Sequence, residues 1–246
     1  MSKSSILWIR LNEWYKKPFK VWKSDIIYNM FLFLSTCIFF WPVLLHPDQL
    51  LYFGDVVYAF YPWGLFAQSM FKEGQLPLWH PYGACGEPFV ASIETAVFYP
   101  PNLVLFSVFP ANLALGYGYL FHTFLAGCFM YLYMKHLKLD RDCSFLSSII
   151  FMYSGFFLAN AISGHYSMIS AACWLPLIFL LFERALKKTS VVYGLLTGVS
   201  LGFQLLAGHI QIPFLTLIAL GLYLIFRSVL SIKEKRAYKK VAQFFA

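Results

Sequence analysis

The chain has 246 residues, of which 60% are hydrophobic and only 12% charged, and its mean hydropathy is +0.65. Soluble domains carry charge on about one quarter of their residues. The composition therefore excludes an ordinary soluble protein and indicates an integral membrane protein. The formal net charge is +8, from 19 Lys and Arg against 11 Asp and Glu.

Six apolar segments follow one another along the chain, each close to the ~17–25 residues that a helix needs to cross a bilayer. We therefore expect an all-α integral membrane protein with about six transmembrane helices. They are predicted at residues 26–45, 112–134, 144–161, 167–182, 191–207 and 210–226. Pro176 predicts that the fourth span starts earlier or is kinked. The last two spans are predicted to form a hairpin with Gly208 and His209 at its tip.

Basic residues are distributed unevenly over the connections between these spans. If the spans alternate in direction, 18 of the 19 Lys and Arg fall on one side of the membrane. The positive-inside rule assigns that side to the cytoplasm, which predicts a multi-pass protein of the cell membrane with both termini cytoplasmic. Topology thus explains the net charge, and no nucleic-acid partner is expected.

Three regions result from this reading. They are a basic cytoplasmic segment (1–25), a membrane domain (26–226) and a basic cytoplasmic tail (227–246). Residues 6–22 mix aromatic and aliphatic side chains with basic ones. They either lie on the inner membrane surface beside anionic lipids or form a disordered tail that only fixes orientation.

The first outside loop, residues 46–101, holds five carboxylates but a single basic residue, Lys72. Residues 64–73 are amphipathic, which predicts a short helix in the outer membrane interface. Residues 76–88 are punctuated by Pro and Gly and predict turns. A multi-spanning protein that gathers carboxylates, aromatic residues and glycines on one face is expected to hold a reaction or binding site there.

Asp55 is the first candidate for chemistry. It follows the first span closely, where a carboxylate can act as a general base toward a hydroxyl or bind Mg²⁺ or Mn²⁺ that bridges phosphate oxygens. The alternative is an acid that caps the interfacial helix or simply meets water. Glu94 and Glu87 are the next candidates, because a reaction at a lipid phosphate commonly needs a second carboxylate that orients the donor or a metal ion. The alternative interpretation is that each is a solvated acid of the loop.

The other outside tips each pair a glycine with a histidine, in Gly164-His165 and Gly208-His209. Both tips lie on the carboxylate side, so the imidazoles are candidates for contact with an anionic lipid headgroup. The alternative is an interfacial histidine that bonds a helix end. His122 lies in the middle of a span and is predicted to be a core histidine.

Several motifs resemble the N-terminal membrane region of the bacterial YfhO-like family, which is similar to the GT-C superfamily of multi-spanning glycosyltransferases. The most specific are Leu76-Pro77-Leu78-Trp79 with Pro81-Tyr82, and Phe98-Tyr99-Pro100-Pro101-Asn102. The likeness runs from about residue 54 to residue 226. It includes Gly54-Asp55, Tyr61-Pro62-Trp63, Gly86-Glu87-Pro88 and Leu206-Ala207-Gly208-His209-Ile210-Gln211.

The resemblance implies an inverting glycosyltransferase that moves a sugar from a polyprenyl-phosphate donor to a cell-envelope acceptor on the outer face of the cytoplasmic membrane. Asp55 occupies the place of the essential loop acid of such enzymes. The histidines of the tips are expected near the donor phosphate, and loop aromatics beside lipid and sugar. The predicted substrate-binding residues are Glu94, Glu87, His80, Trp79, Tyr61, His165, His209 and Gln211. Any metal, Mg²⁺ or Mn²⁺, is expected on Asp55 and Glu94.

The chain also departs from the family pattern. Family members often carry Gln where this chain has Glu94, Asn where it has His80, and Pro where it has Ile210. They also continue with further spans, so this chain is expected to be a fragment or a reduced form. The alternatives are a binder or transporter of lipid-linked sugar without chemistry, and an inactive remnant. Ion-coupled transport is disfavoured, because the predicted spans hold no ionisable residue besides His122.

Overall fold

The computed structural model describes residues 23–46, 54–83 and 85–244, with side chains described as far as residue 230. Most of the predicted N-terminal segment (1–22) thus lies outside the described residues. The described chain is helical and contains no β-strand; one isolated bridge pairs His80 with Glu87. The longer helices are α2 (Lys23–Phe39), α4 (Tyr61–Lys72), α6 (Ala111–His136), α7 (Arg141–Met152), α10 (Leu175–Lys188), α11 (Val191–Leu206) and α12 (Gln211–Phe244). The shorter ones are α3 (Trp41–Leu45), α5 (Pro100–Val108), α8 (Gly155–Ser163) and α9 (Tyr166–Ala172).

Within the described residues, four helical stretches are long and apolar enough to cross a membrane: Ala111–His136, Arg141–Ser163, Tyr166–Lys188 and Gln211–Leu230. Two further apolar helices, Ser24–Phe39 and Val191–Leu206, are shorter. Helices suit a bilayer because they satisfy every backbone polar group within the segment. The predicted all-helical fold is therefore confirmed for the described residues, and its apolar helices indicate a membrane-associated protein.

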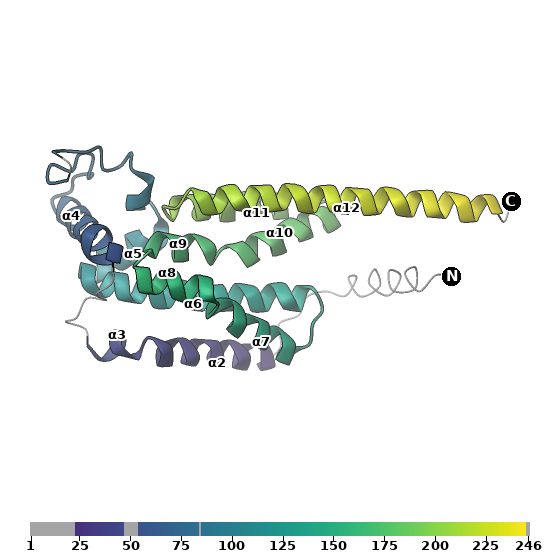
Figure 1. Cartoon of the computed structure of the whole chain (residues 1–246), viewed down its shortest axis with the longest axis horizontal. Helices are drawn as coiled ribbons and strands as arrows, with labels where there is room; N and C mark the ends of the chain where they lie inside the picture. Colours follow the sequence, from purple (N-terminus) through teal and green to yellow (C-terminus); the bar gives the residue numbers. More distant parts are fainter. Residues whose placement is uncertain (1–22, 47–53, 84, 245–246) are drawn as a thin grey trace.

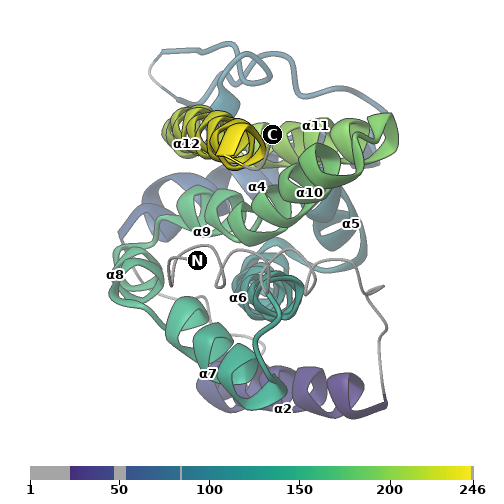
Figure 2. The same cartoon turned by 90° about the vertical axis from the view of Figure 1, so that its right-hand side faces the viewer.

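Helix α6 runs through the centre of the molecule. In the end-on view, α2 and α7 lie on one side of it, while α9 and α10 separate it from α11 and α12 (Figure 2). Its buried face includes small residues that admit close neighbours. A Cβ added to Gly118 would lie 2.3 Å from the Tyr166 hydroxyl oxygen, and one added to Gly127 would lie 2.7 Å from the Met152 sulfur.

Three of the predicted spans are interrupted. The first breaks at Phe40, between α2 and α3. The third breaks between α7 and α8 at Tyr153 and Ser154, directly before Gly155. The fourth begins at Tyr166 and breaks before α10, which carries Pro176 in its first turn. Proline is tolerated there because the first turn has no backbone bond to lose. Of the two predicted alternatives, the structure shows an interruption beside Pro176, whereas the start differs from the predicted one by a single residue.

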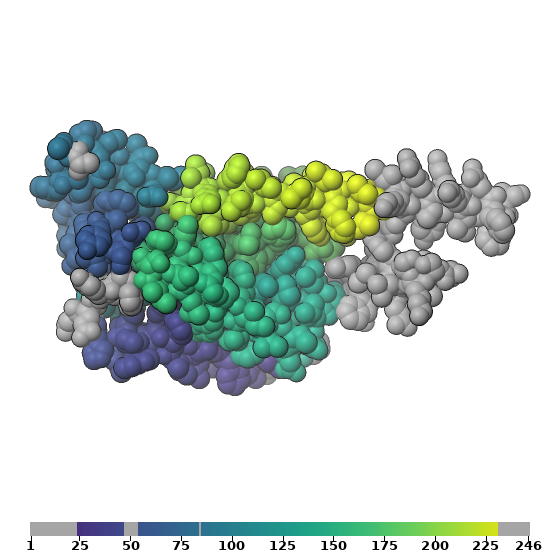
Figure 3. Space-filling model, in the orientation of Figure 1, coloured from purple at the N-terminus to yellow at the C-terminus, as the bar shows by residue number. Residues whose placement is uncertain are grey.

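The two ends of the molecule differ in character. The loop segments with α4 and α5 gather at the left-hand end of Figure 1, beside the α8–α9 and α11–α12 tips. The space-filling view shows the same segment as a cap over that end (Figure 3). The starts of α2 and α7 and the ends of α6 and α10 lie at the opposite end, where α12 projects beyond its neighbours (Figure 1).

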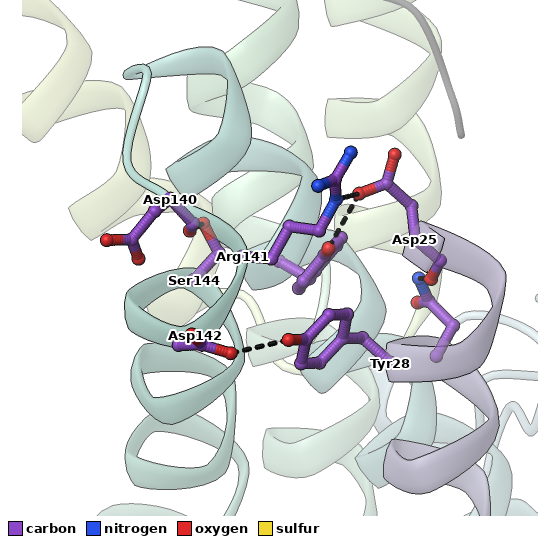
Figure 4. A network of polar contacts seen from close by, with 8 residues as sticks. Asp25, Tyr28, Asp140, Arg141, Asp142 and Ser144 are labelled. Carbon is purple, nitrogen blue, oxygen red and sulfur yellow. Dashed lines mark hydrogen bonds and ion pairs between the residues drawn. The ribbon is translucent and has the colours of Figure 1, made fainter. Parts of the chain in front are cut away.

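An ionic cluster fastens α2 to its neighbours at this opposite end (Figure 4). Asp25 is buried, and its Oδ1 lies 3.1 Å from Arg141 Nε and accepts a hydrogen bond of 2.8 Å from the Tyr131 hydroxyl. Tyr28 donates to Asp142 from the same helix. A buried carboxylate needs such partners, because an isolated charge is costly away from water.

Helix α7 begins at a side-chain cap. Asp140 accepts a hydrogen bond of 2.8 Å from the Cys143 backbone N–H, the usual role of an acid at a helix N-terminus. That backbone bond lowers the pKa of the Asp140 carboxyl below its ordinary value. The cap fixes where the chain turns from the connection into the third span.

A second polar network lies buried near the loop end. The Trp174 indole N–H donates to the Tyr99 hydroxyl oxygen over 2.8 Å, and that hydroxyl lies 2.9 Å from His122 Nε2. His122 Nδ1 lies 2.6 Å from the Gly118 carbonyl oxygen, so Nδ1 carries the proton and Nε2 accepts from Tyr99. Burial raises the pKa of the Tyr99 hydroxyl, which keeps it neutral. His122 is thus a satisfied core histidine, as predicted.

Candidate functional site

Four of the residues predicted from sequence line one small cavity at the loop end of the molecule. This cavity, here called the acid pocket, has a volume of about 140 Å³. It is lined by Asp55, Glu94, His165 and His209, together with Ala59, Phe60, Trp63, Ser167 and Met168. Its walls come from four segments that are far apart in the sequence.

Asp55 directly precedes a π-helical turn, η1 (Val56–Phe60), that leads into α4. Single π turns often occur at functional sites, and a carboxylate near a helix N-terminus is favoured by the helix dipole. Val56, the next residue, is fully buried and anchors this turn in the core. Asp55 itself stays accessible, with 56% of its side chain exposed.

His165 faces Asp55 across the pocket, with Nε2 at 3.4 Å from Asp55 Oδ2. Its other nitrogen, Nδ1, lies 2.9 Å from Asn160 Oδ1. The Asn160 amide cannot be reversed without loss, because its Nδ2 donates to the Phe156 carbonyl oxygen at 2.8 Å. Both nitrogens of His165 therefore face oxygen atoms, and Nδ1 is placed to donate to the Asn160 side-chain oxygen.

His209 lies at the tip between α11 and α12, as predicted. Its Nε2 is buried and makes no hydrogen bond within the described residues. Buried polar atoms are nearly always bonded. A nitrogen without a protein partner in the wall of a cavity is therefore suited to a polar atom of a ligand.

Three of the four pocket side chains directly follow a glycine with positive φ: Gly54 (+32°), Gly164 (+82°) and Gly208 (+96°). Two of these glycines make backbone contacts that a side chain would prevent. A Cβ on Gly54 would lie 2.3 Å from the Ser163 carbonyl oxygen, and one on Gly208 would lie 3.0 Å from that of Ile93. The first contact draws Asp55 toward His165, and the second draws His209 toward Glu94.

The structure does not bring the remaining predicted residues into the acid pocket. Glu87 pairs instead with His80, at 3.3 Å between Oε1 and Nδ1, where two backbone hydrogen bonds of 2.8 and 3.0 Å join the same residues. This pair stabilises the turn region at residues 76–88. The others are elsewhere: Trp79 is exposed and covers Gly86, Tyr61 is half-buried in α4, and Gln211 is exposed at the start of α12.

Sequence reasoning expected loop aromatics beside the substrate but did not name Ala59, Phe60 or Trp63 as site residues, and it missed the partner of His165. Ala59 and Trp63 follow Asp55 at intervals of four and eight residues, a helical spacing that places them on one face. This spacing is visible in the sequence. It was missed because the interfacial helix was predicted to begin at residue 64, whereas α4 begins at Tyr61. Asn160 gave no such signal, because a turn at Gly164 separates it from His165.

Asp55 and Glu94, the predicted ligands of a metal ion, both line the acid pocket. The described residues contain no group of three or more His, Cys, Asp and Glu side chains that could hold a metal ion. Mg²⁺ usually takes one or two carboxylates and completes its shell with phosphate oxygens and water. Asp55 and Glu94 alone do not form a protein metal centre, and the predicted metal requirement stays a prediction.

No protein-family model, no curated protein and no solved structure matches this chain. The resemblance to the YfhO-like family thus rests on the sequence motifs alone.

Proposed function

We propose that this chain is the membrane part of a glycosyltransferase, which transfers a sugar from a polyprenyl-phosphate donor to a cell-envelope acceptor. The observation that carries the proposal is the acid pocket, in which two carboxylates and two histidines from distant segments meet beside aromatic residues. Such a constellation supports acid–base chemistry on a substrate with an anionic leaving group.

The roles follow from the chemistry of each side chain. Asp55 accepts the proton of the acceptor hydroxyl as its oxygen attacks the anomeric carbon of the sugar. The bond from that carbon to the phosphate oxygen breaks, and polyprenyl phosphate leaves with the electron pair. One displacement inverts the anomeric configuration. The imidazole of His165 and the unbonded nitrogen of His209 are placed to donate hydrogen bonds to the phosphate oxygens as charge grows on them.

In the full proposal, six helices cross the cell membrane, both termini are cytoplasmic, and the acid pocket opens on the outer face. The distribution of basic residues supports this orientation. The loop end of the molecule contains a single basic residue between residues 46 and 110, whereas the connections after α6 and α10 are basic.

The test uses membranes that contain the full chain and a radiolabelled polyprenyl-phosphate sugar. We expect Asp55→Asn to lower the transfer of label by about 10²–10⁴-fold, the usual contribution of a general base. Glu73→Gln is the matched control, because Glu73 is an exposed acid of the same loop outside the pocket, and it should keep wild-type activity. Undiminished transfer by Asp55→Asn would refute the mechanism. Donor binding by the wild type without any product would favour a non-catalytic binder.

A further inference from the structure

A second, larger cavity of about 450 Å³ lies beside the acid pocket and is here called the apolar cavity. Phe60 and Trp63 line both spaces, so these two rings form a shared wall. The apolar cavity extends from Phe60, the last residue of η1, along α4, whose residues 63, 64, 67, 68, 71 and 72 line it at helical spacing. Leu103 and Phe106 of α5 close the other side.

The uncharged polar side chains in its wall are already bonded within the protein. Gln68 Nε2 donates to the carbonyl oxygens of Phe106 and Phe109, both at 2.6 Å. Asn102 Oδ1 accepts from the Tyr166 hydroxyl at 2.8 Å, and the Thr95 hydroxyl donates to the carbonyl oxygen of Ser92 at 2.8 Å. A sugar in this cavity would lose its hydrogen bonds to water without replacement. A hydrocarbon chain would not.

One charged side chain lies at the end of the cavity. Lys72 is exposed in the last turn of α4, and it is the sole Lys or Arg between Lys23 and Lys135 in the sequence. None of the ion pairs formed by the described residues includes it. An apolar space with one cation at its end complements a molecule with a hydrocarbon chain and one anionic group.

We propose that the apolar cavity binds a hydrocarbon chain of an anionic membrane lipid, with the anionic group of the lipid on Lys72 and the chain along α4. The shared wall then seats the chain against Phe60 and Trp63, next to the acid pocket. This inference goes beyond sugar transfer and does not depend on it, because a protein without catalytic activity would bind the lipid in the same way.

Trp63 provides the probe for the test. The full chain is placed in detergent micelles that contain either phosphatidylglycerol or phosphatidylcholine with brominated chains, which quench nearby indoles. The signal of Trp63 is obtained by subtraction of the Trp63→Phe variant. We expect the anionic lipid to half-quench Trp63 at about fivefold lower mole fraction, since one Lys attracts an anionic headgroup by about 1 kcal/mol.

Two variants with matched controls separate the effect of the Lys72 charge from the effect of the apolar cavity. Lys72→Gln should erase the preference for the anionic lipid, whereas Lys188→Gln, an exposed basic residue at the opposite end, should keep it. Ala67→Phe should fill the cavity and reduce quenching by both lipids, whereas Ala159→Phe, on the exposed face of α8, should not. Circular dichroism checks that each variant folds.

Three results would overturn the proposal. They are equal quenching by both lipids in the wild type, a preference that survives Lys72→Gln, and quenching that a folded Ala67→Phe variant leaves unchanged. If Ala67→Phe fails to fold, the Lys72→Gln result alone decides.

Discussion

The hydroxyl group of Tyr99 serves two buried partners at once, as acceptor for the Trp174 indole and donor to His122. Tyr99→Phe removes both bonds and leaves a buried N–H and a buried ring nitrogen without these partners. Since an unsatisfied buried group costs about 1–3 kcal/mol, we expect the free energy of unfolding to fall by about 2 kcal/mol. Chemical unfolding in detergent measures this change. Tyr58→Phe, at a residue 83% exposed, should leave stability unchanged, and equal stabilities of the two variants would contradict the network.

Asp25 and Arg141 form an ion pair of unequal burial. The Asp25 side chain is only 7% exposed, whereas that of Arg141 is 35% exposed. Arg141→Met leaves the Asp25 carboxylate without this partner. Loss of one member of a fully buried pair costs about 3–5 kcal/mol, and solvent around Arg141 reduces the expected loss to about 1–3 kcal/mol.

The double variant Asp25→Asn, Arg141→Met provides the matched comparison. The asparagine introduced in α2 is neutral, and its side-chain oxygen can still accept from the Tyr131 hydroxyl. We expect the double variant to recover most of the stability lost by Arg141→Met, as measured by thermal unfolding. No recovery would mean that charge burial is not the cause.

At the scale of elements, the tip between α11 and α12 reaches the loop at η2 (Ile93–Thr95) because Gly208 has no side chain. Gly208→Ala forces a Cβ to 3.0 Å from the Ile93 carbonyl oxygen, at a φ of +96° that alanine rarely adopts. The tip must shift, and His209 moves with it. A displacement of about 1 Å in a catalytic site can lower activity by about 10²-fold, which the transfer assay would detect.

Gly194→Ala is the control for this change, because no atom lies within 4 Å of a Cβ added to Gly194 in α11. Alanine is favoured over glycine in a helix by up to about 1 kcal/mol, so this variant should keep activity and lose no stability. If Gly208→Ala kept full activity as well, the approach of the tip to the loop would not matter for the site.

At the scale of the whole molecule, two native cysteines report the orientation in the membrane. Cys85 is exposed in the loop, and Cys143 is exposed at the start of α7, at the opposite end. We expect a membrane-impermeant maleimide to label Cys85 in intact cells and Cys143 only after permeabilisation. Cys85→Ser should abolish the label in intact cells. Label on Cys143 without permeabilisation would reverse the predicted orientation.

The sequence alone was sufficient to locate the apolar helical segments of the fold. Each of the six predicted apolar segments coincides with helical structure, because segments this apolar must bury their backbone bonds in helices. The interruptions of these segments were harder to predict. Pro176 pointed to the break before α10, whereas Ser154-Gly155, at the break after α7, was not recognised as a turn signal. The start of α4 was misplaced because the Pro62 position was not recognised as a first helical turn.

The sequence by itself also determined that one long loop, residues 46–101, carries five acids with a single Lys, and which dipeptides place a histidine after a glycine. Only the tertiary structure decided which of these residues meet. Glu94 and Glu87 are both loop acids of similar surroundings in the sequence, yet Glu94 lines the acid pocket and Glu87 pairs with His80. The physical reason is that backbone contacts at Gly54 and Gly208 join segments far apart in the chain, and such contacts leave no periodic pattern in the residues themselves.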